Sequence, residues 1–480
     1  MRIALAAAEV TPFAKTGGLG DVAAALARYL AKHGHDVRLF LPLYGRIDRT
    51  KVRFTPVAFL QDVPVAMGGR TFPFSVYASP LPNSDLPVYF ISCPGLFGRD
   101  EIYSAKGDEH LRMAMLSRAA IECCQRMGFA PHVFHVNDWH TALVPLYLKT
   151  LYAWDRLFAA TKTVLTLHNL AYQGAFPASR VADVGLAGFE SLLHQEELRA
   201  GRFSFMTSGL LYADAVTAVS ETYAREIQTP EHGMGLDPIL RARSGSVFGI
   251  VNGVDYDEWS PEKDPLIPAR YAASDLSGKA VCRRHLLAKF GLDADPSAPV
   301  IGIVSRLTSQ KGFELAFDVL PQRLARENIR LVALGSGAAS LVSFFSGLQR
   351  TFASKVRFHE GYSNEIAHEI EAGADMFLMP SQFEPCGLNQ MYSLRYGTPP
   401  IVRRTGGLAD TVQPWNPATG QGTGFVFEHF TSTGLAWALD TALAAFRDRA
   451  AWRRLQQNGM AMDFSWDRQI QRYVALYGRL

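Results

Sequence analysis

Residues 3–41 read IALAAAEVTPFAKTGGLGDVAAALARYLAKHGHDVRLFL, and this stretch decides the predicted fold. The apolar run Ile3–Ala8 predicts a buried strand, Asp21 is the expected N-cap, and Val22–Lys32 has the pattern of a helix. A second strand is expected over Asp36–Leu41. The stretch is therefore one strand–helix–strand unit, which predicts an open α/β domain with a parallel sheet.

The apolar runs that follow extend this pattern through the first half of the chain. Further strands are expected there, separated mostly by helical or loop stretches. A segment rich in turn residues, Val247–Asp264, then predicts a crossing between two domains. The additional strands expected in the first half are Val88–Ser92, Val133–Val136, Thr163–Leu167 and Ala215–Val219.

A second α/β pattern occupies the other half and includes a helix expected over Phe313–Glu327. The predicted organisation is an N-terminal Rossmann-like domain over 1–246, a C-terminal Rossmann-like domain over 247–460, and a final helix within 461–480 that packs back on the first domain. Ligands bind at the carboxyl ends of parallel strands, so the two domains are expected to face each other across a deep cleft. The strands expected in the second domain are Val300–Ser305, Ile329–Leu334, Val356–His359, Met376–Pro380 and Pro400–Val402.

Composition narrows the class of protein. The chain has 480 residues, 48% of them hydrophobic, and a net charge of +3, which favours two compact domains and implies neither a nucleic-acid nor a membrane partner. The 5 cysteines are irregularly spaced, which favours reduced thiols over a disulfide framework. No apolar stretch approaches the ~20 residues of a membrane span. We therefore expect a cytoplasmic protein whose partner is small or neutral.

Two nearly identical motifs stand near opposite ends of the chain. Each follows an apolar run and precedes a helical pattern, so each is expected to place glycine amides and a cation where a helix N-terminus holds an anion. Two such loops on two domains suggest a phosphate cleft. The first glycine loop is Lys15-Thr16-Gly17-Gly18-Leu19-Gly20-Asp21, and the second is Arg404-Thr405-Gly406-Gly407-Leu408-Ala409-Asp410.

Two other loops of the second domain carry charges suited to a sugar phosphate. Glu384 lies between a strand and a helix and is able to grip sugar hydroxyls, or it only favours the helix dipole; the local sequence leaves both open. Arg306 and Lys311 follow the first strand, where cations neutralise a diphosphate leaving group. The alternative for these two is a solvated loop.

Polar residues also follow strands of the first domain. Asp138 beside Trp139 suits sugar hydroxyls and a sugar face, whereas His168 is by itself more typical of a buried histidine bonded to the backbone. A metal site is the alternative for the cluster around Asp138, but strand alternation turns His135 away from some of its neighbours. The cluster consists of His132, His135, Asp138 and His140.

Two further loop residues have a functional and a structural interpretation. Tyr362 either stacks on a nucleobase or simply packs in its loop. Cys386 lies near a helix start, as a nucleophile can, but no histidine base is adjacent, which favours a polar or packing role.

Taken together, these motifs resemble the bacterial glycogen synthase family, and the resemblance is ordered and spans nearly the whole chain. The family's fold is called GT-B and consists of a pair of facing Rossmann-like domains, in agreement with the domains expected above. The motifs that carry the resemblance are Lys15 to Val22, Asn137-Asp138-Trp139-His140, His168 to Gly174, Asn252-Gly253-Val254-Asp255, Ser305-Arg306-Leu307 with Gln310-Lys311-Gly312, Glu384 to Leu388 and Thr405 to Asp410.

The resemblance implies retaining transfer of glucose from ADP-glucose to the nonreducing 4-hydroxyl of an α-1,4-glucan, with no metal or other cofactor. In this family the leaving phosphate can take the acceptor proton on the same face of the sugar, and closure of the domains limits hydrolysis. The implied catalytic residues are Glu384, Arg306, Lys311, His168 and Asp138. The implied donor-binding residues are Lys15, Gly18, Asp21, Asn252, Tyr362, Cys386, Gly387, Leu388, Thr405, Gly406 and Gly407.

Within that set, Lys15 and Gly18 are expected to contact the diphosphate from the first domain. Asp138, His168 and Asn252 complete the sugar pocket. In the second domain Glu384, with amides near Cys386 and Gly387, holds the glucosyl hydroxyls, while Tyr362 and Leu388 flank the adenine.

One position departs from the pattern of many related enzymes. Those enzymes carry a second glutamate eight residues after the first, where this chain has Tyr392, so the ribose contact is not assigned. UDP-glucose as donor, a phosphorylase-like enzyme and a noncatalytic nucleotide- or glycogen-binding regulator are the alternatives. The sequence does not determine the oligomeric state, the allosteric control, the preferred glucan length or whether a covalent intermediate forms.

Overall fold

The computed structural model describes residues 1–480, and the chain divides into two compact units. Unit 1 comprises Met1–Val219, Ala224–Gly253 and Trp466–Leu480, and unit 2 comprises Ser220–Tyr223 and Val254–Ser465. None of the helices combines the length and apolarity that a membrane crossing requires.

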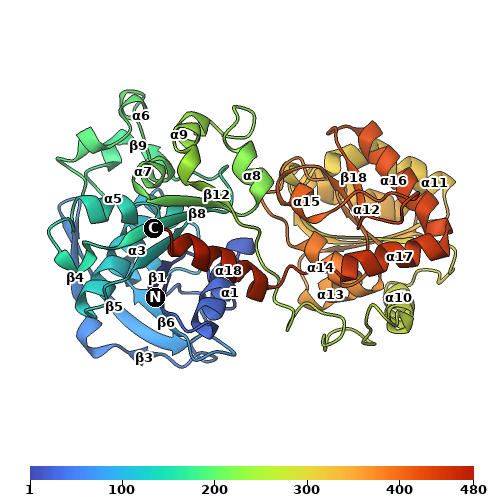
Figure 1. Cartoon of the computed structure of the whole chain (residues 1–480), viewed down its shortest axis with the longest axis horizontal. Coiled ribbons are helices and arrows are strands. Elements are labelled where there is room, and N and C mark those ends of the chain that lie inside the picture. The colour runs from blue at the N-terminus through green and yellow to red at the C-terminus, as the bar shows by residue number, and fades with distance from the viewer. The chain divides into compact units, whose positions relative to one another are not determined.

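Unit 1 is built on a ten-stranded sheet whose larger part is parallel (Figure 1). Chain order reverses between β1 and β7, so the loops that follow these neighbouring strands diverge and leave room for a ligand at their carboxyl ends. The parallel strands, in order across the sheet, are β12 (Val247–Gly249), β11 (Ala215–Ala218), β8 (Lys162–Leu167), β7 (Val133–Asn137), β1 (Arg2–Ala6), β2 (Asp36–Pro42) and β6 (Pro87–Ser92).

The sheet also has an antiparallel extension beyond β6 that was not expected from the sequence. Prolines within these runs obscured it, because proline weakens a strand prediction. A separate two-stranded hairpin lies elsewhere in this unit. The extension consists of β5 (Arg70–Pro80), β3 (Thr55–Pro56) and β4 (Val63–Met67), and the hairpin of β9 (Ala175–Pro177) and β10 (Arg202–Ser204).

The first helix differs from its prediction at the N-terminus. Helix α1 (Gly18–Lys32) begins at Gly18, and Gly17 is its N-cap with an extended backbone, so the expected N-cap at Asp21 is wrong. Asp21 lies in the first turn, where a carboxylate still favours the positive end of the helix. It accepts a hydrogen bond from Thr11 Oγ1 at 2.8 Å, which keeps it away from the backbone amides that a cap would bind.

The C-terminal helix α18 (Trp466–Tyr477) belongs to unit 1 and lies beside α1 (Figure 1). Tyr477 Oη lies 2.6 Å from His135 Nδ1, and Lys32 Nζ donates to Asp467 at 3.0 Å. A Cβ atom at Gly253 would lie 2.5 Å from the ring of Trp466, so glycine is needed where the chain leaves this unit. The chain passes from unit 1 to unit 2 after Gly253 and not at residue 247, the expected boundary. Residues 247–249 form β12, which pairs with β11 of unit 1.

Unit 2 contains a six-stranded sheet in which every pair is parallel. Chain order reverses between β13 and β16, which again places divergent loops side by side. Most predicted strands are confirmed here, but β18 was missed because it spans only three residues. In order across the sheet the strands are β15 (Val356–Glu360), β14 (Arg330–Gly337), β13 (Val300–Leu307), β16 (Met376–Met379), β17 (Pro400–Arg403) and β18 (Phe425–Phe427).

Helices cover both faces of this second sheet (Figure 1). Successive side chains of a strand point to opposite faces of the sheet, so both faces are apolar and need cover. Ile301 and Ile303 belong to one apolar cluster, and Val300 belongs to the other. The helix expected over Phe313–Glu327 is divided into a 3-10 turn and an α-helix. Helices α11 (Ala316–Arg326), α12 (Ala339–Thr351) and α16 (Ser432–Arg447) contribute to the first cluster, and α10 (Ser277–Lys289) and α13 (Asn364–Gly373) to the second.

Candidate active site

The charged centre of unit 2 is an ion pair at the point where chain order reverses. Lys311 follows β13, Glu384 follows β16, and Lys311 Nζ lies 2.6 Å from Glu384 Oε2. Ser381 Oγ donates to the same oxygen at 2.9 Å. The two charged side chains are 18% and 7% exposed, so each partner lowers the cost of burying the other. The arrangement fixes a carboxylate at the carboxyl end of the sheet.

The second glycine loop supports the Glu384 loop directly. Gly407 N donates to the carbonyl of Glu384 at 3.0 Å. A Cβ atom would lie 2.0 Å from the Glu384 carbonyl oxygen if placed at Gly406, and 2.0 Å from that of Cys386 if placed at Gly407. Both glycines are therefore required by backbone packing. The expectation that this loop presents its amides to an anion is wrong for Gly407, whose amide is used internally.

Two hydroxyl residues that the sequence did not indicate complete this support. Ser220 Oγ donates to the carbonyl of Pro385 at 2.6 Å, and Thr222 Oγ1 donates to Asp410 at 2.6 Å. Thr222 N donates to the same carboxylate at 2.8 Å. Both residues lie far away in the chain, within the short segment Ser220–Tyr223 that groups with unit 2. No local pattern reveals such long-range partners.

The other expected residues of unit 2 lie around this pair in different settings. Cys386 is buried, and its carbonyl accepts from Gln390 Nε2 at 3.0 Å, so its loop is held from within. Gly387 has a φ of 72°, and Leu388 is the N-cap of helix α14 (Asn389–Arg395). Thr405 is the buried N-cap of the six-residue helix α15 (Gly406–Thr411).

Two of the expected residues are exposed and form no hydrogen bond or ion pair with Lys311 or Glu384. Arg306 lies within β13 itself, because the strand extends to Leu307 instead of ending at Ser305 as expected. Tyr362, which follows β15, is 68% exposed and its hydroxyl donates to Asn364 at 3.1 Å. Both side chains are exposed to solvent.

In unit 1, Asp138 and His168 meet at the carboxyl ends of β7 and β8. Asp138 Oδ1 accepts the amide of His168 at 2.7 Å and that of Asn169 at 3.4 Å. Asp138 adopts a left-handed φ of 52°, a strained conformation that often marks functional sites. The structure therefore brings two expected catalytic residues of this unit into direct contact.

Burial alters the charge of both groups. It raises the pKa of Asp138 to about 7, against the opposing effect of the two backbone amides. It lowers the pKa of His168 to about 3, so the imidazole is neutral at physiological pH. Asn137 Nδ2 donates to the carbonyl of Ala6, which turns Asn137 Oδ1 toward His168 Nε2 at 2.9 Å. Nε2 therefore carries the proton, and Nδ1 is left as an acceptor.

The first glycine loop lies next to this group and is already bound to a carboxylate of the chain itself. Glu9 Oε2 accepts the amides of Thr16 at 2.5 Å and Gly17 at 3.1 Å. Lys15 Nζ lies 2.7 Å from Asp21 Oδ2. Gly18 opens helix α1 beside them. Glu9 was not identified from the sequence, although it stands between the first strand and the loop.

Asn252 is the remaining expected residue of unit 1 and follows β12. It is 4% exposed, and its Oδ1 is buried without a hydrogen-bond partner. A buried acceptor without a donor is unfavourable unless a ligand hydroxyl or water supplies one. This geometry is compatible with the expected contact to a sugar.

The histidine cluster of unit 1 does not converge on one point. His135 bonds to Tyr477 Oη and to Thr166 Oγ1, both at 2.6 Å. His132 Nδ1 accepts the amide of Arg2 at 2.9 Å. The chain contains no grouping of three histidine, cysteine or acidic side chains placed to hold a metal ion. The hydrogen bonds give these histidines structural positions.

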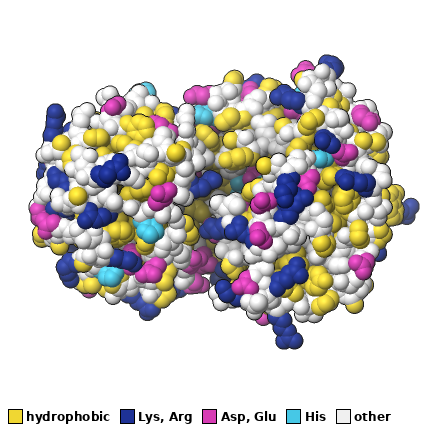
Figure 2. All heavy atoms as spheres, turned by 180° about the vertical axis from the view of Figure 1, so that it is seen from behind, with side chains coloured by type: hydrophobic (Ala, Val, Ile, Leu, Met, Phe, Trp, Pro, Cys, Tyr) yellow, Lys and Arg dark blue, Asp and Glu magenta, His cyan; other side chains and the backbone are white.

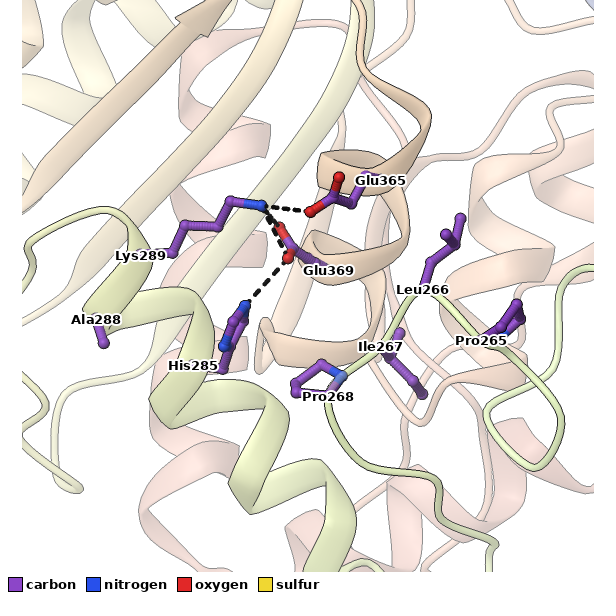
Figure 3. Close-up of a pocket in the computed structure, with 9 residues that line it drawn as sticks. All are labelled: Pro265, Leu266, Ile267, Pro268, His285, Ala288, Lys289, Glu365 and Glu369. Carbon is purple, nitrogen blue, oxygen red and sulfur yellow. Dashed lines mark hydrogen bonds and ion pairs between the residues drawn. The ribbon is translucent and has the colours of Figure 1, made fainter.

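A cavity of about 630 Å³ lies elsewhere in unit 2, between the 265–268 loop and helices α10 and α13 (Figure 3). None of the expected site residues lines it. The charged side chains that line it form ion pairs with one another. Lys289 Nζ bonds to Glu365 at 2.9 Å and to Glu369 at 2.7 Å, and His285 contacts Glu369 at 3.1 Å. On the face in Figure 2, basic and acidic side chains are interspersed without a broad area of one sign.

Two family models match successive parts of the chain. Residues 2–242 match the family described as starch synthase catalytic domain, and residues 287–458 match glycosyl transferases group 1. The chain is 45% identical to the glycogen synthase of Anaeromyxobacter sp. (strain Fw109-5), covering 100% of this chain and 99% of the relative. It is also 45% identical to the glycogen synthase of Koribacter versatilis, over 99% of this chain and 98% of that one.

Solved structures show the same similarity. The catalytic domain of starch synthase IV from Arabidopsis thaliana, bound to ADP and acarbose, superposes with a TM-score of 0.91 at 34% identity, covering 100% of this chain and 98% of that chain. Sucrose-phosphate synthase from Thermosynechococcus elongatus shares the fold alone, with a TM-score of 0.63 at 19% identity over 100% of this chain and 98% of that chain.

Proposed function

This chain belongs to the glycogen synthase family of GT-B glycosyltransferases, and from that premise we propose that it transfers glucose from ADP-glucose to the nonreducing 4-hydroxyl of an α-1,4-glucan. The observation that carries the proposal is the partly buried pair of Lys311 and Glu384 at the reversal of strand order in unit 2. It combines a cation for a departing phosphate with a carboxylate for sugar hydroxyls in one place.

In the proposed reaction, Lys311 and Arg306 neutralise the diphosphate as the bond to the anomeric carbon breaks. No metal or other cofactor takes part in this proposal. The acceptor hydroxyl attacks on the face that the diphosphate leaves, and the leaving phosphate takes its proton, so the anomeric configuration is retained. Glu384 holds the glucosyl hydroxyls, and its contact with Ser381 keeps the carboxylate in place.

In the proposed reaction, residues of unit 1 contact the sugar and the diphosphate. His168 presents an unprotonated Nδ1, which accepts a sugar hydroxyl without adding charge. Asp138, whose pKa is raised to about 7, contacts the same sugar together with Asn252. Lys15 and Gly18 bind the diphosphate, and Tyr362 and Leu388 flank the base in unit 2.

The choice of ADP-glucose is supported by the ADP bound to the similar plant starch synthase IV. All cysteines of the chain are buried thiols outside any disulfide, which supports the proposed cytoplasmic location. The direct test is to incubate the purified protein with glycogen and either ADP-glucose or UDP-glucose, and to measure the nucleoside diphosphate released and the glucose incorporated. We expect strong preference for ADP-glucose. Release from neither donor would refute the proposal.

The same assay tests the ion pair. Glu384→Ala and Lys311→Ala are each expected to lower turnover at least about 100-fold, in line with the loss of comparable electrostatic contacts in other enzymes. Circular dichroism and thermal unfolding would confirm that the variants fold. A folded variant with near-normal turnover would remove that residue from the proposed mechanism.

A further inference from the structure

Glu9 binds four donors beneath the first glycine loop. Besides the amides of Thr16 and Gly17, its carboxylate accepts Thr16 Oγ1 at 2.7 Å and Tyr103 Oη at 2.5 Å. The residue is only 3% exposed. Charge-assisted hydrogen bonds of this kind are among the stronger contacts in proteins. One carboxylate therefore holds the backbone of the loop at Thr16 and Gly17.

Successive backbone amides of this kind usually form a cradle for an external anion. Here the internal carboxylate already occupies the cradle made by Thr16 and Gly17. The amides that begin the fifteen-residue helix α1 at Gly18 lie beyond it, with Lys15 on the same loop. An external diphosphate therefore meets the helix start and Lys15, rather than the two amides before them.

Glu9 also connects this loop to the group around Asp138. The ring of Tyr103, whose hydroxyl binds Glu9, stacks on His140 with centroids 5.0 Å apart and an interplanar angle of 22°. His140 lies two residues after Asp138 in the helix α4 (Asp138–Thr141). Through Tyr103, Glu9 thus connects the carboxyl ends of β1 and β7, the two strands where chain order reverses in unit 1.

We propose that Glu9 is a positioning residue for the donor diphosphate: a permanent internal anion that holds Lys15 to Gly18 in the binding conformation. This inference rests on the proposed function. The alternative is that Glu9 competes with the diphosphate and leaves when it binds. Displacement would strand a buried carboxylate without its four donors, which is strongly unfavourable, so the geometry favours the permanent role.

The two roles predict opposite effects of removing the carboxylate. If Glu9 positions the loop, Glu9→Ala raises the KM for ADP-glucose and weakens ADP binding, each about tenfold, with a smaller fall in kcat. Glu9→Gln keeps the volume and one acceptor oxygen, so its values are expected between those of the wild type and Glu9→Ala. If Glu9 is a competitor, both variants bind ADP more tightly than the wild type.

The experiment measures ADP affinity by calorimetry and the steady-state constants for ADP-glucose at saturating glycogen. Glu122→Gln is a matched control, because Glu122 also accepts a tyrosine hydroxyl, that of Tyr152 at 2.7 Å, on the helix α3 (Glu109–Arg126). The control is expected to leave both constants unchanged. Glu9→Gln decides the question even where Glu9→Ala fails to fold.

Tighter or unchanged ADP binding in folded Glu9→Gln would overturn the proposal, as would an equal effect of the Glu122→Gln control. Failure of the proposed function is distinguishable, because the wild type would then transfer no glucose from either nucleotide sugar. Graded loss of donor affinity from wild type to Gln to Ala, in an active wild-type enzyme, would support the positioning role.

Discussion

Replacing Asp138 by asparagine tests whether the site holds an unfavourable buried charge. Burial raises the pKa of this carboxyl from 3.8 to about 7, so the folded state keeps a proton that the unfolded chain releases. This rise in the pKa corresponds to about 4 kcal/mol of folding free energy. The stabilisation of the folded state by the protonated carboxyl is fully present below pH 3.8 and is lost as the pH rises through 7. Asparagine does not titrate and keeps an oxygen for the amides of His168 and Asn169.

Asp138→Asn is therefore expected to be more stable than the wild type above pH 7 by up to about 4 kcal/mol, with the difference vanishing toward pH 4. Urea unfolding of both proteins across that range measures it, and glucose transfer at pH 7.5 should fall in the same variant. Asp214→Asn is the matched control, because Asp214 accepts the amide of Thr163 at 2.7 Å but its side chain is 25% exposed. A stability difference that does not depend on pH, or a loss of stability at pH 8, would refute the reasoning.

Three further variants test contacts elsewhere. Gly407→Ala places a Cβ atom 2.0 Å from the Cys386 carbonyl oxygen, so we expect about 1–3 kcal/mol of lost stability in urea unfolding together with weaker donor binding. Lys15→Ala should raise the KM for ADP-glucose more than it lowers kcat, because its contact is expected in ground and transition states alike; steady-state kinetics with an unchanged KM would contradict this. Tyr477→Phe leaves the buried Nδ1 of His135 without its partner and should cost about 1–3 kcal/mol, measured by thermal unfolding.

The parallel core of both units was predictable because its signals are local. Apolar runs such as Ile3–Ala8 and Val300–Ser305 are bounded by turn residues and alternate with helical patterns, and these features need no knowledge of distant contacts. The position of the Lys311 and Glu384 loops after neighbouring strands follows from the same rule. The antiparallel extension formed by Arg70–Pro80 was missed because its strand pairing depends on partners that local patterns do not identify.

The residues that hold the loops of the site in place were less predictable than the charged residues of the site itself. Glu9 and Tyr103 are separated by more than ninety positions in the chain, yet their side chains meet at 2.5 Å. Ser220 likewise reaches Pro385 from another part of the chain. Neither pair has a sequence signature, because a single carboxylate or hydroxyl is equally common on a solvated surface. One signal was available: Glu9 directly follows a buried strand, where carboxyl-end residues of parallel sheets meet ligands.

The two glycine loops show how one motif can satisfy two different requirements. At Gly17 a Cβ atom would meet nothing within 4 Å, whereas at the equivalent Gly406 it would lie 2.0 Å from the carbonyl oxygen of Glu384. The first loop is therefore open at Gly17, whose backbone amide donates to Glu9. The second is closed, and its glycines allow it to pack against the backbone around Glu384. A small side chain should thus be tolerated sterically at Gly17 and not at Gly406, although the two motifs are nearly identical.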